Sequence, residues 1–251
     1  MKQIYAIFKP LGLTPLEALE KLRKKRKLPQ NLKITYAGRL DPMAQGVLLL
    51  LAGDKVKEKG KYLKLPKTYR AEVLFGISTD TFDRLGIIAK TSKDVPDAAR
   101  IRSALTKAAK QKTLQAPVYS SIPVKGLPSF VHARAGRLGQ EDGLKRTMNF
   151  GRITNFKCRR ISAGRVLKRT LSDVQKVRGD FRQEKIIKSW RSSLKKNGNF
   201  LLAAFAVSCS SGSYIRSLAH FAGKEARCPA LLYNLTRTSV GRYLLQNSEK
   251  V

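Results

Sequence analysis

The sequence predicts a protein of the α+β class, on three observations. Stretches that alternate apolar and polar residues, typical of strands, are interspersed with stretches at helical spacing. The two kinds of segment do not follow the regular strand–helix–strand repetition of parallel α/β folds. We find no internal repeat and no segment with the composition of an interdomain linker, so residues 1–251 are expected to form a single domain.

A capped helix is the clearest local signal near the N-terminus. Thr14 can cap it, Pro15 suits its first turn, and Glu17 completes a capping box. Leucines then follow at helical spacing: Leu16, Leu19 and Leu22. The helix should end in the basic run at residues 23–27, which either complements the helix dipole or binds a polyanion.

The remaining elements follow from periodicity and from turn residues. We expect strands at residues 4–8, 68–77, 86–90 and 200–208, a turn and then an apolar stretch within residues 34–54, an extended or loop segment at residues 116–128, and a helix near residues 172–195. Two further helices should begin at Asp97 and at Ser213, with Gly223 as the stop of the second.

The charge balance points to a polyanionic partner. Lys and Arg number 51 against 17 Asp and Glu, a net charge of +34. Each phosphate that a cation neutralises releases counterions, so nucleic acid is the first candidate and an anionic membrane the second. The longest apolar run, residues 47–52, is far too short to span a bilayer. Residues 145–196 are the densest positive region, with 17 basic and three acidic residues.

The sequence carries no pattern for a metal, a disulfide framework or a secretory leader. The three cysteines are widely spaced and odd in number, and there are two histidines. The first eight residues lack a long apolar region. We therefore expect a cytoplasmic protein that binds no metal and needs no cofactor.

Asp41 is the candidate for catalysis, in the turn Gly38-Arg39-Leu40-Asp41-Pro42. No Ser-His-Asp set and no phosphate-binding glycine loop is evident. Several further blocks accompany this turn: Lys9-Pro10-x-Gly12-x-Thr14, Lys67-Thr68-Tyr69-Arg70-Ala71, Gly76-x-x-Thr79-Asp80-Thr81-x-Asp83-x-x-Gly86, Val118-Tyr119-Ser120-Ser121 with Ala133-Arg134, residues 207–218, and Leu235-Thr236-Arg237-Thr238 with Gly241.

In this order the blocks resemble the bacterial tRNA pseudouridine-55 synthase (TruB) family, in a short form without a C-terminal RNA-binding PUA domain. The resemblance implies the pseudouridine synthase fold, a mixed or antiparallel central sheet with flanking helices, here with a basic insertion. It also implies an isomerase that converts uridine to pseudouridine in tRNA at T-loop position 55, with tRNA as the partner and no membrane. We expect a monomer.

The resemblance assigns the site residues. Asp41, Tyr69 and Arg216 would be catalytic, with Arg216 as the partner of the Asp41 carboxylate and Tyr69 stacked on the uracil or removing a proton. The residues that would bind substrate are Lys9, Tyr36, Arg39, Tyr214 and Leu235. A thumb-like loop at about residues 127–149 would close on the RNA. Tyr36 stands where the family usually has a histidine that helps to displace the base.

Purely structural readings stand beside these assignments. An isolated Asp before Pro is usually a turn residue, Tyr69 alone would be a core aromatic, and Lys9 could be a support of the Asp41 loop or a surface lysine. Asp80 and Asp83 could order their turn or touch RNA. The rival functions are a non-catalytic RNA-binding or tRNA-folding protein on the same scaffold and a basic ribosome-associated protein.

Overall fold

The structure is a computed structural model, which describes residues 3–139, 142, 144–194 and 198–251. The elements follow in the order β1 (Ile4–Lys9), α1 (Pro15–Lys25), β2 (Ile34–Ala37), β3 (Ala44–Ala52), η1 (Gly53–Val56), α2 (Lys59–Leu63), β4 (Lys67–Phe75), β5 (Ile77–Thr79), β6 (Ile88–Thr91), α3 (Ala98–Lys110), β7 (Thr113–Gln115), β8 (Pro123–Val124), β9 (Leu127–Pro128), α4 (Ser129–Arg134), β10 (Lys145–Thr147), β11 (Thr154–Ser162), α5 (Ala163–Gln175), α6 (Gln183–Ser193), β12 (Asn199–Cys209), α7 (Ile215–Ala226), β13 (Ala230–Val240), β14 (Tyr243–Leu244), η3 (Leu245–Asn247) and β15 (Glu249–Lys250).

One mixed sheet organises the molecule and confirms the α+β prediction. Its strands lie in the order β11-β12-β4-β13-β3-β1-β15, with β2 added beside β3 and β14 beside β13. The β13–β3 and β1–β15 pairs are parallel, and the other pairs of this sheet are antiparallel. Gly46 permits the close β3–β13 approach: its φ is +116°, and a Cβ there would lie 2.2 Å from the Arg237 carbonyl oxygen.

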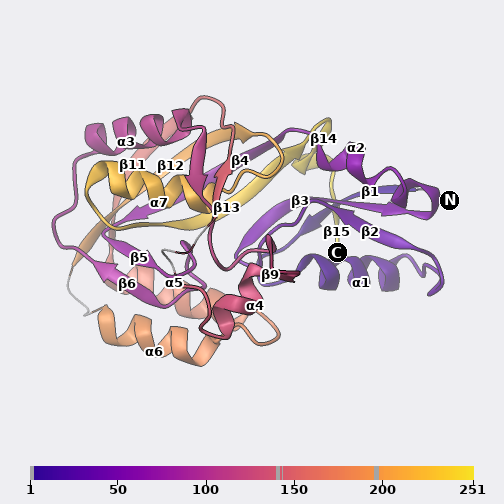
Figure 1. Cartoon of the computed structure of the whole chain (residues 1–251), viewed down its shortest axis with the longest axis horizontal. Coiled ribbons are helices and arrows are strands. Elements are labelled where there is room, and N and C mark those ends of the chain that lie inside the picture. The colour runs from indigo at the N-terminus through magenta and orange to yellow at the C-terminus, as the bar shows by residue number, and fades with distance from the viewer. Residues whose placement is uncertain (1–2, 140–141, 143, 195–197) are drawn as a thin grey trace.

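Helices cover both faces of the sheet around strands β4 and β12 (Figure 1). Helices α3 and α7 pack on one face against alternate residues of β4 and β12, including Val73, Phe75 and Phe205. Helices α5 and α6 pack on the other face, against Leu74 and Leu202. This two-sided burial follows from the period of two along each strand, which sends neighbouring side chains to opposite faces.

The predicted helix starts are largely confirmed, and one predicted stop is wrong. Thr14 and Glu17 form the capping box of α1, and Asp97 caps α3. Helix α7 continues past Gly223 to Ala226, and Arg227 provides the left-handed C-cap. Gly223 instead permits close packing, because a Cβ there would lie 2.8 Å from the Cys228 carbonyl oxygen and 2.9 Å from the Ala230 Cβ.

The single helix expected near residues 172–195 is also wrong, because the segment forms two helices. Helix α5 ends at Gln175, and α6 begins at Gln183 after a loop in which Gly179 and Arg182 have positive φ. We call residues 163–194 the helical insertion, since they lie between the neighbouring antiparallel strands β11 and β12. Each helix is amphipathic, and α6 buries Ile186 and Trp190.

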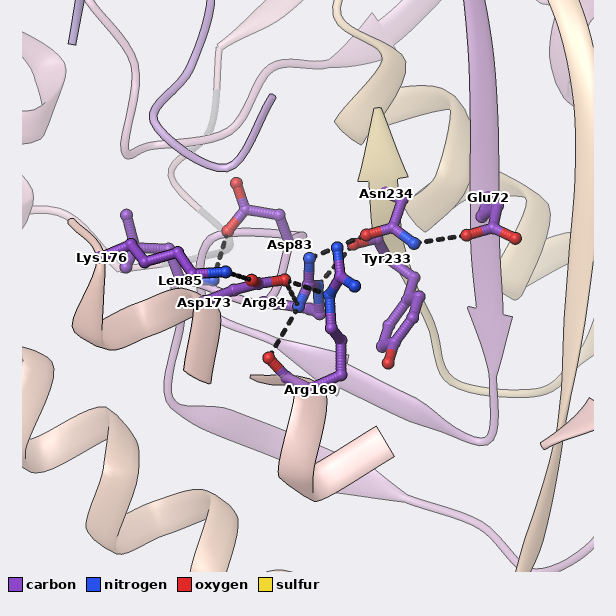
Figure 2. A network of polar contacts seen from close by, with 9 residues as sticks. All are labelled: Glu72, Asp83, Arg84, Leu85, Arg169, Asp173, Lys176, Tyr233 and Asn234. Atoms are coloured by element: carbon purple, nitrogen blue, oxygen red, sulfur yellow. Dashed lines mark hydrogen bonds and ion pairs between the residues drawn. The ribbon is translucent and has the colours of Figure 1, made fainter. Parts of the chain in front are cut away.

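A buried ionic network fixes the helical insertion to the sheet (Figure 2). Arg84 is fully buried and donates from Nη1 to Asp173 of α5 at 2.8 Å and from Nη2 to the Asn234 side chain of β13 at 2.8 Å. Asp173 is also fully buried and accepts bonds from Arg169 and Lys176. A buried charge is stable only when paired in this way, so the network sets where α5 lies.

Candidate active site

A cavity of about 490 Å³ lies where several segments of the chain meet. Its walls include the β2–β3 connection with Asp41, the first half of β4 with Tyr69, the turn with Asp83, the first turn of α7 with Arg216, and β13 with Leu235. The volume is in the range of small-ligand sites. The structure therefore brings the three predicted catalytic residues into one cavity.

Asp41 and Arg216 form the central ion pair of the cavity. Arg216 Nε lies 2.9 Å from Asp41 Oδ2 and 3.8 Å from Asp83 Oδ2. Arg216 Nη1 donates to the backbone carbonyls of Thr81 at 3.2 Å and Tyr119 at 3.1 Å. The guanidinium is thus held on several sides while it faces Asp41.

The two carboxylates around Arg216 differ in their access to the cavity. The side chain of Asp41 is 37% exposed and that of Asp83 only 9%. Burial raises the pKa of Asp83 against the opposing charge of Arg216. Burial disfavours the charge of Arg216 too, but Asp41 and Asp83 outweigh it, so the pKa of Arg216 is raised. Arg216 therefore stays cationic, and Asp41 is the carboxylate presented to a ligand.

Asp83 orders its own turn as well as facing Arg216. Its Oδ1 accepts bonds from the Thr81 hydroxyl at 2.8 Å and the Leu85 amide at 2.9 Å. Asp80 accepts the Ile87 amide at 2.8 Å. Both aspartates therefore have the turn-ordering role that was one of the two expectations for them.

Tyr69 and Arg237 form a cross-strand pair beside Asp41, on the neighbouring strands β4 and β13. Burial raises the pKa of Tyr69, and the nearby positive charge of Arg237 opposes part of that rise. The phenol is neutral at pH 7, which favours stacking on a base over proton removal by a phenolate. Arg237 also donates to the carbonyls of Val47 at 2.7 Å and Arg39 at 3.1 Å, and so ties β3 and the Asp41 loop to β13.

Lys9 is fully buried rather than placed at the cavity surface. Its Nζ donates to the carbonyls of Leu13 at 2.6 Å and Pro10 at 3.0 Å. Burial lowers its pKa to about 7, against the opposing charge of Asp41. In the same turn the Gly12 amide donates to the Pro42 carbonyl at 2.8 Å. This geometry fits support of the Asp41 loop better than direct contact with substrate.

The other predicted substrate-binding residues line the cavity: Tyr36, Arg39, Tyr214 and Leu235. Arg39 donates to the Ser121 hydroxyl, and Tyr36 lies under the Lys59 ammonium, 5.5 Å from the ring centre. The two histidines lie elsewhere: His132 is hydrogen-bonded to the Val124 carbonyl at 2.9 Å, and His220 stacks on Phe82 at 3.9 Å.

Several residues of the cavity were not assigned from the sequence. Asp83 and Arg237 lie within motif blocks, so their blocks were signals for them. Phe130 lies within the predicted thumb-like loop, whereas Phe181 and Arg182 carried no such signal, since their places depend on how the helical insertion packs around the cavity. Among the described residues, no group of three or more His, Cys, Asp or Glu could hold a metal, and no helix is long and apolar enough to cross a membrane.

Comparison with known protein sequences finds a matching family and relatives that align over most of this chain. Residues 25–170 match the TruB family pseudouridylate synthase (N terminal domain). The tRNA pseudouridine synthase B of Burkholderia mallei is 30% identical over 240 residues, 96% of this chain and 65% of that protein. The protein of the same description from Clostridium acetobutylicum is 29% identical over 97% of this chain and 68% of its own length. The chain thus spans about two thirds of these relatives.

Solved structures with the same fold have more distant sequences. A Cbf5-Nop10-Gar1 complex contains a chain with a TM-score of 0.56 at 18% identity, covering 96% of this chain and 50% of that one. An H/ACA RNP bound to a substrate RNA containing 2'-deoxyuridine gives a TM-score of 0.53 at 17% identity, covering 99% and 50%. The family match spans more than half of the sequence, and the chain belongs to the TruB family of pseudouridylate synthases.

Proposed function

We propose that the protein converts uridine to pseudouridine in tRNA, at T-loop position 55. The observation that carries the proposal is the Asp41–Arg216 ion pair, in which the carboxylate opens into a cavity that also contains Tyr69. The descriptions of the relatives and the net charge of +34 support RNA as the substrate.

The reaction breaks the N1–C1′ bond of uridine, rotates the detached uracil, joins C5 to C1′ and releases the C5 proton to solvent. A carboxylate such as Asp41 can act as a nucleophile on the sugar, either at C1′ or after a glycal has formed. Arg216 holds Asp41 Oδ2, and the 37% of the Asp41 side chain that stays exposed leaves the carboxylate accessible for this role. No change of oxidation state occurs in these steps.

The rest of the cavity would hold the base during its rotation. The target uridine must leave the stack of its loop, which costs a few kcal/mol that contacts in the pocket offset. Tyr69 offers a ring for the uracil, and Tyr214 and Leu235 close the apolar side. The thumb would comprise β9, α4 and the chain to about residue 149, of which residues 140, 141 and 143 lie outside the described part.

We further propose that the protein works in the cytoplasm and needs neither metal nor cofactor. Cys158, Cys209 and Cys228 form no disulfide in the described structure, as expected of a reducing compartment. The chemistry above requires only a carboxylate, a cation to orient it and a surface for the base.

The test is tritium release from unmodified tRNA labelled at uracil C5. The wild-type protein should release tritium, and Asp41→Asn should release none while still binding tRNA. Release by neither protein, with binding retained, would instead favour the tRNA-folding function. Mapping of the modified nucleotide by sequencing then tests position 55. A product at another uridine would overturn the assigned position and leave the assigned reaction intact.

A further inference from the structure

The tip of the helical insertion forms part of the cavity wall. Phe181 and Arg182, in the loop between α5 and α6, line the same cavity as Asp41. They are far in sequence from the motif blocks that supply the rest of the site. The insertion therefore does more than cover the sheet.

Two contacts hold the Arg182 side chain in place, and its backbone conformation is uncommon. Its Nη1 forms an ion pair with Asp80 at 2.7 Å, and its guanidinium lies over the Tyr119 ring at 4.1 Å from the centre. Its backbone adopts the left-handed conformation, with φ 63° and ψ 30°. A non-glycine residue keeps this conformation only where its surroundings impose it, and such residues are frequent at functional sites.

A second contact between an arginine and aromatic rings lies at the same wall of the cavity. The Arg134 guanidinium of α4 lies 5.3 Å from the Phe181 ring centre and 5.4 Å from that of Phe130. Arg134 Nη2 also donates to the Asp180 carbonyl at 2.6 Å, which ties α4 to the tip of the insertion. We call these five residues the stacking wall: Tyr119, Phe130, Arg134, Phe181 and Arg182.

The composition of the stacking wall matches what binds unpaired RNA bases. Aromatic rings and guanidinium planes are the surfaces on which extruded bases stack, and the cations also attract the adjoining phosphates. Tyr69, Tyr214 and Leu235 line the same cavity as Asp41 and are assigned to the target uracil, so the wall is available for another base. Its place at the same cavity suits a nucleotide next to the target.

We propose that the stacking wall binds an unpaired base adjacent to the target uridine, which makes Phe181 and Arg182 specificity-determining residues. The inference rests on the proposed function, because it takes RNA as the occupant of the cavity. The helical insertion would then help to select which RNA loop, and therefore which uridine, is bound. Helices α5 and α6 then hold this loop rigidly through the Arg84–Asp173 pair.

The test is a coupling measurement on RNA binding, made in the inactive Asp41→Asn protein. Fluorescence anisotropy gives the Kd for an RNA hairpin with the target uridine in its loop, and for versions with one abasic site at each neighbouring loop position. Arg182→Asn, which keeps a residue tolerant of the left-handed conformation, should weaken binding of the intact hairpin about 10-fold. One abasic hairpin should show a similar loss when the stacking wall is intact. For that hairpin, Arg182→Asn should cause little further loss, because the base that the arginine contacts is already missing.

Two further variants keep the test decisive. Phe181→Leu preserves apolar packing and removes the ring, so it should reproduce the coupling if Arg182→Asn does not fold. Arg191→Asn removes an equal charge from the exposed surface of α6 and should leave the abasic profile unchanged. Two results would overturn the proposal. In one, the loss from each wall variant and the loss from the abasic site multiply independently at every position. In the other, both wall variants bind the intact hairpin as tightly as the unmodified wall does.

The two proposals fail separately. Binding by the inactive protein reports on the stacking wall whether or not the wild type isomerises uridine. Absence of tritium release overturns the proposed function alone, and absence of coupling overturns the stacking site alone.

Discussion

At the residue scale, the site depends on how Arg216 is shared between two carboxylates. Asp41 is close and exposed, and Asp83 is more distant and buried. The motif blocks predicted that Asp41, Tyr69 and Arg216 would meet, and the structure brings them to one cavity. The buried position of Lys9 could not be predicted, because burial depends on which chain segments close over the turn and not on the turn's own sequence.

Arg216→Lys should slow catalysis by roughly 100-fold, as removal of an oriented charge does. An ammonium cannot face Asp41 and also reach the carbonyls of Thr81 and Tyr119 as the guanidinium fork does. Single-turnover tritium release measures the rate, and thermal melting checks the fold. The matched control is Arg102→Lys on the exposed side of α3, and equal rates for the two variants would contradict this role of Arg216.

At the element scale, the helical insertion is where sequence interpretation was weakest. Residues 172–195 carry few apolar residues in a clean period, so the break between α5 and α6 was not predicted. At the break, Arg182 contacts Asp80 and Tyr119, which are distant in sequence and so gave no local signal. Helices α1 and α3 were predictable because their caps are encoded within four neighbouring residues.

Asp173→Ala should destabilise the protein by about 3 to 5 kcal/mol, because it leaves the Arg84 charge buried without its partner. Urea unfolding measures the free energy. The exposed pair Asp54–Lys57 provides the control, since Asp54→Ala should cost less than about 1 kcal/mol. Equal costs at the two sites would show that the buried pair does not fix α5.

His220 of α7 should make the stability of the protein pH-dependent. Burial, with Lys224 and Lys90 nearby, lowers its pKa from 6.5 to about 4. As pH falls from 6.5 to 4 the unfolded chain takes up a proton that the folded chain does not, so this residue lowers the unfolding free energy by up to about 3 kcal/mol. His220→Phe keeps a ring on Phe82 and should remove this contribution. Parallel pH profiles for wild type and variant would contradict the assignment.

At the scale of the whole molecule, the charge of +34 is the dominant property. Helices α5 and α6 lie on one side of the sheet and α3 on the other (Figure 1), and all three helices carry exposed Lys and Arg residues. Composition predicted a polyanionic partner, but which face binds it depends on the fold. Because the insertion also reaches the cavity, its face is the one we expect to meet RNA.

Neutralising Arg165, Lys168, Lys185 and Lys188 to Gln should reduce the salt dependence of tRNA binding. Each lost phosphate contact lowers the slope of log K against log salt by roughly 0.7 to 0.9, so the total change is up to about 3. The matched control neutralises four exposed cations of α3: Arg100, Arg102, Lys107 and Lys110. Equal slopes for the two variants would show that RNA does not prefer the insertion face.

The most direct test of the account is the chemical step of the Asp41→Asn protein, measured with its RNA affinity. Under single turnover, with protein in saturating excess over C5-tritiated tRNA, we predict a loss of roughly 1,000-fold or more in the rate of tritium release. The Kd for tRNA should stay close to that of the wild type, since the Lys and Arg residues that we expect to contact phosphates are unchanged. Release by Asp41→Asn at the wild-type rate would contradict the account.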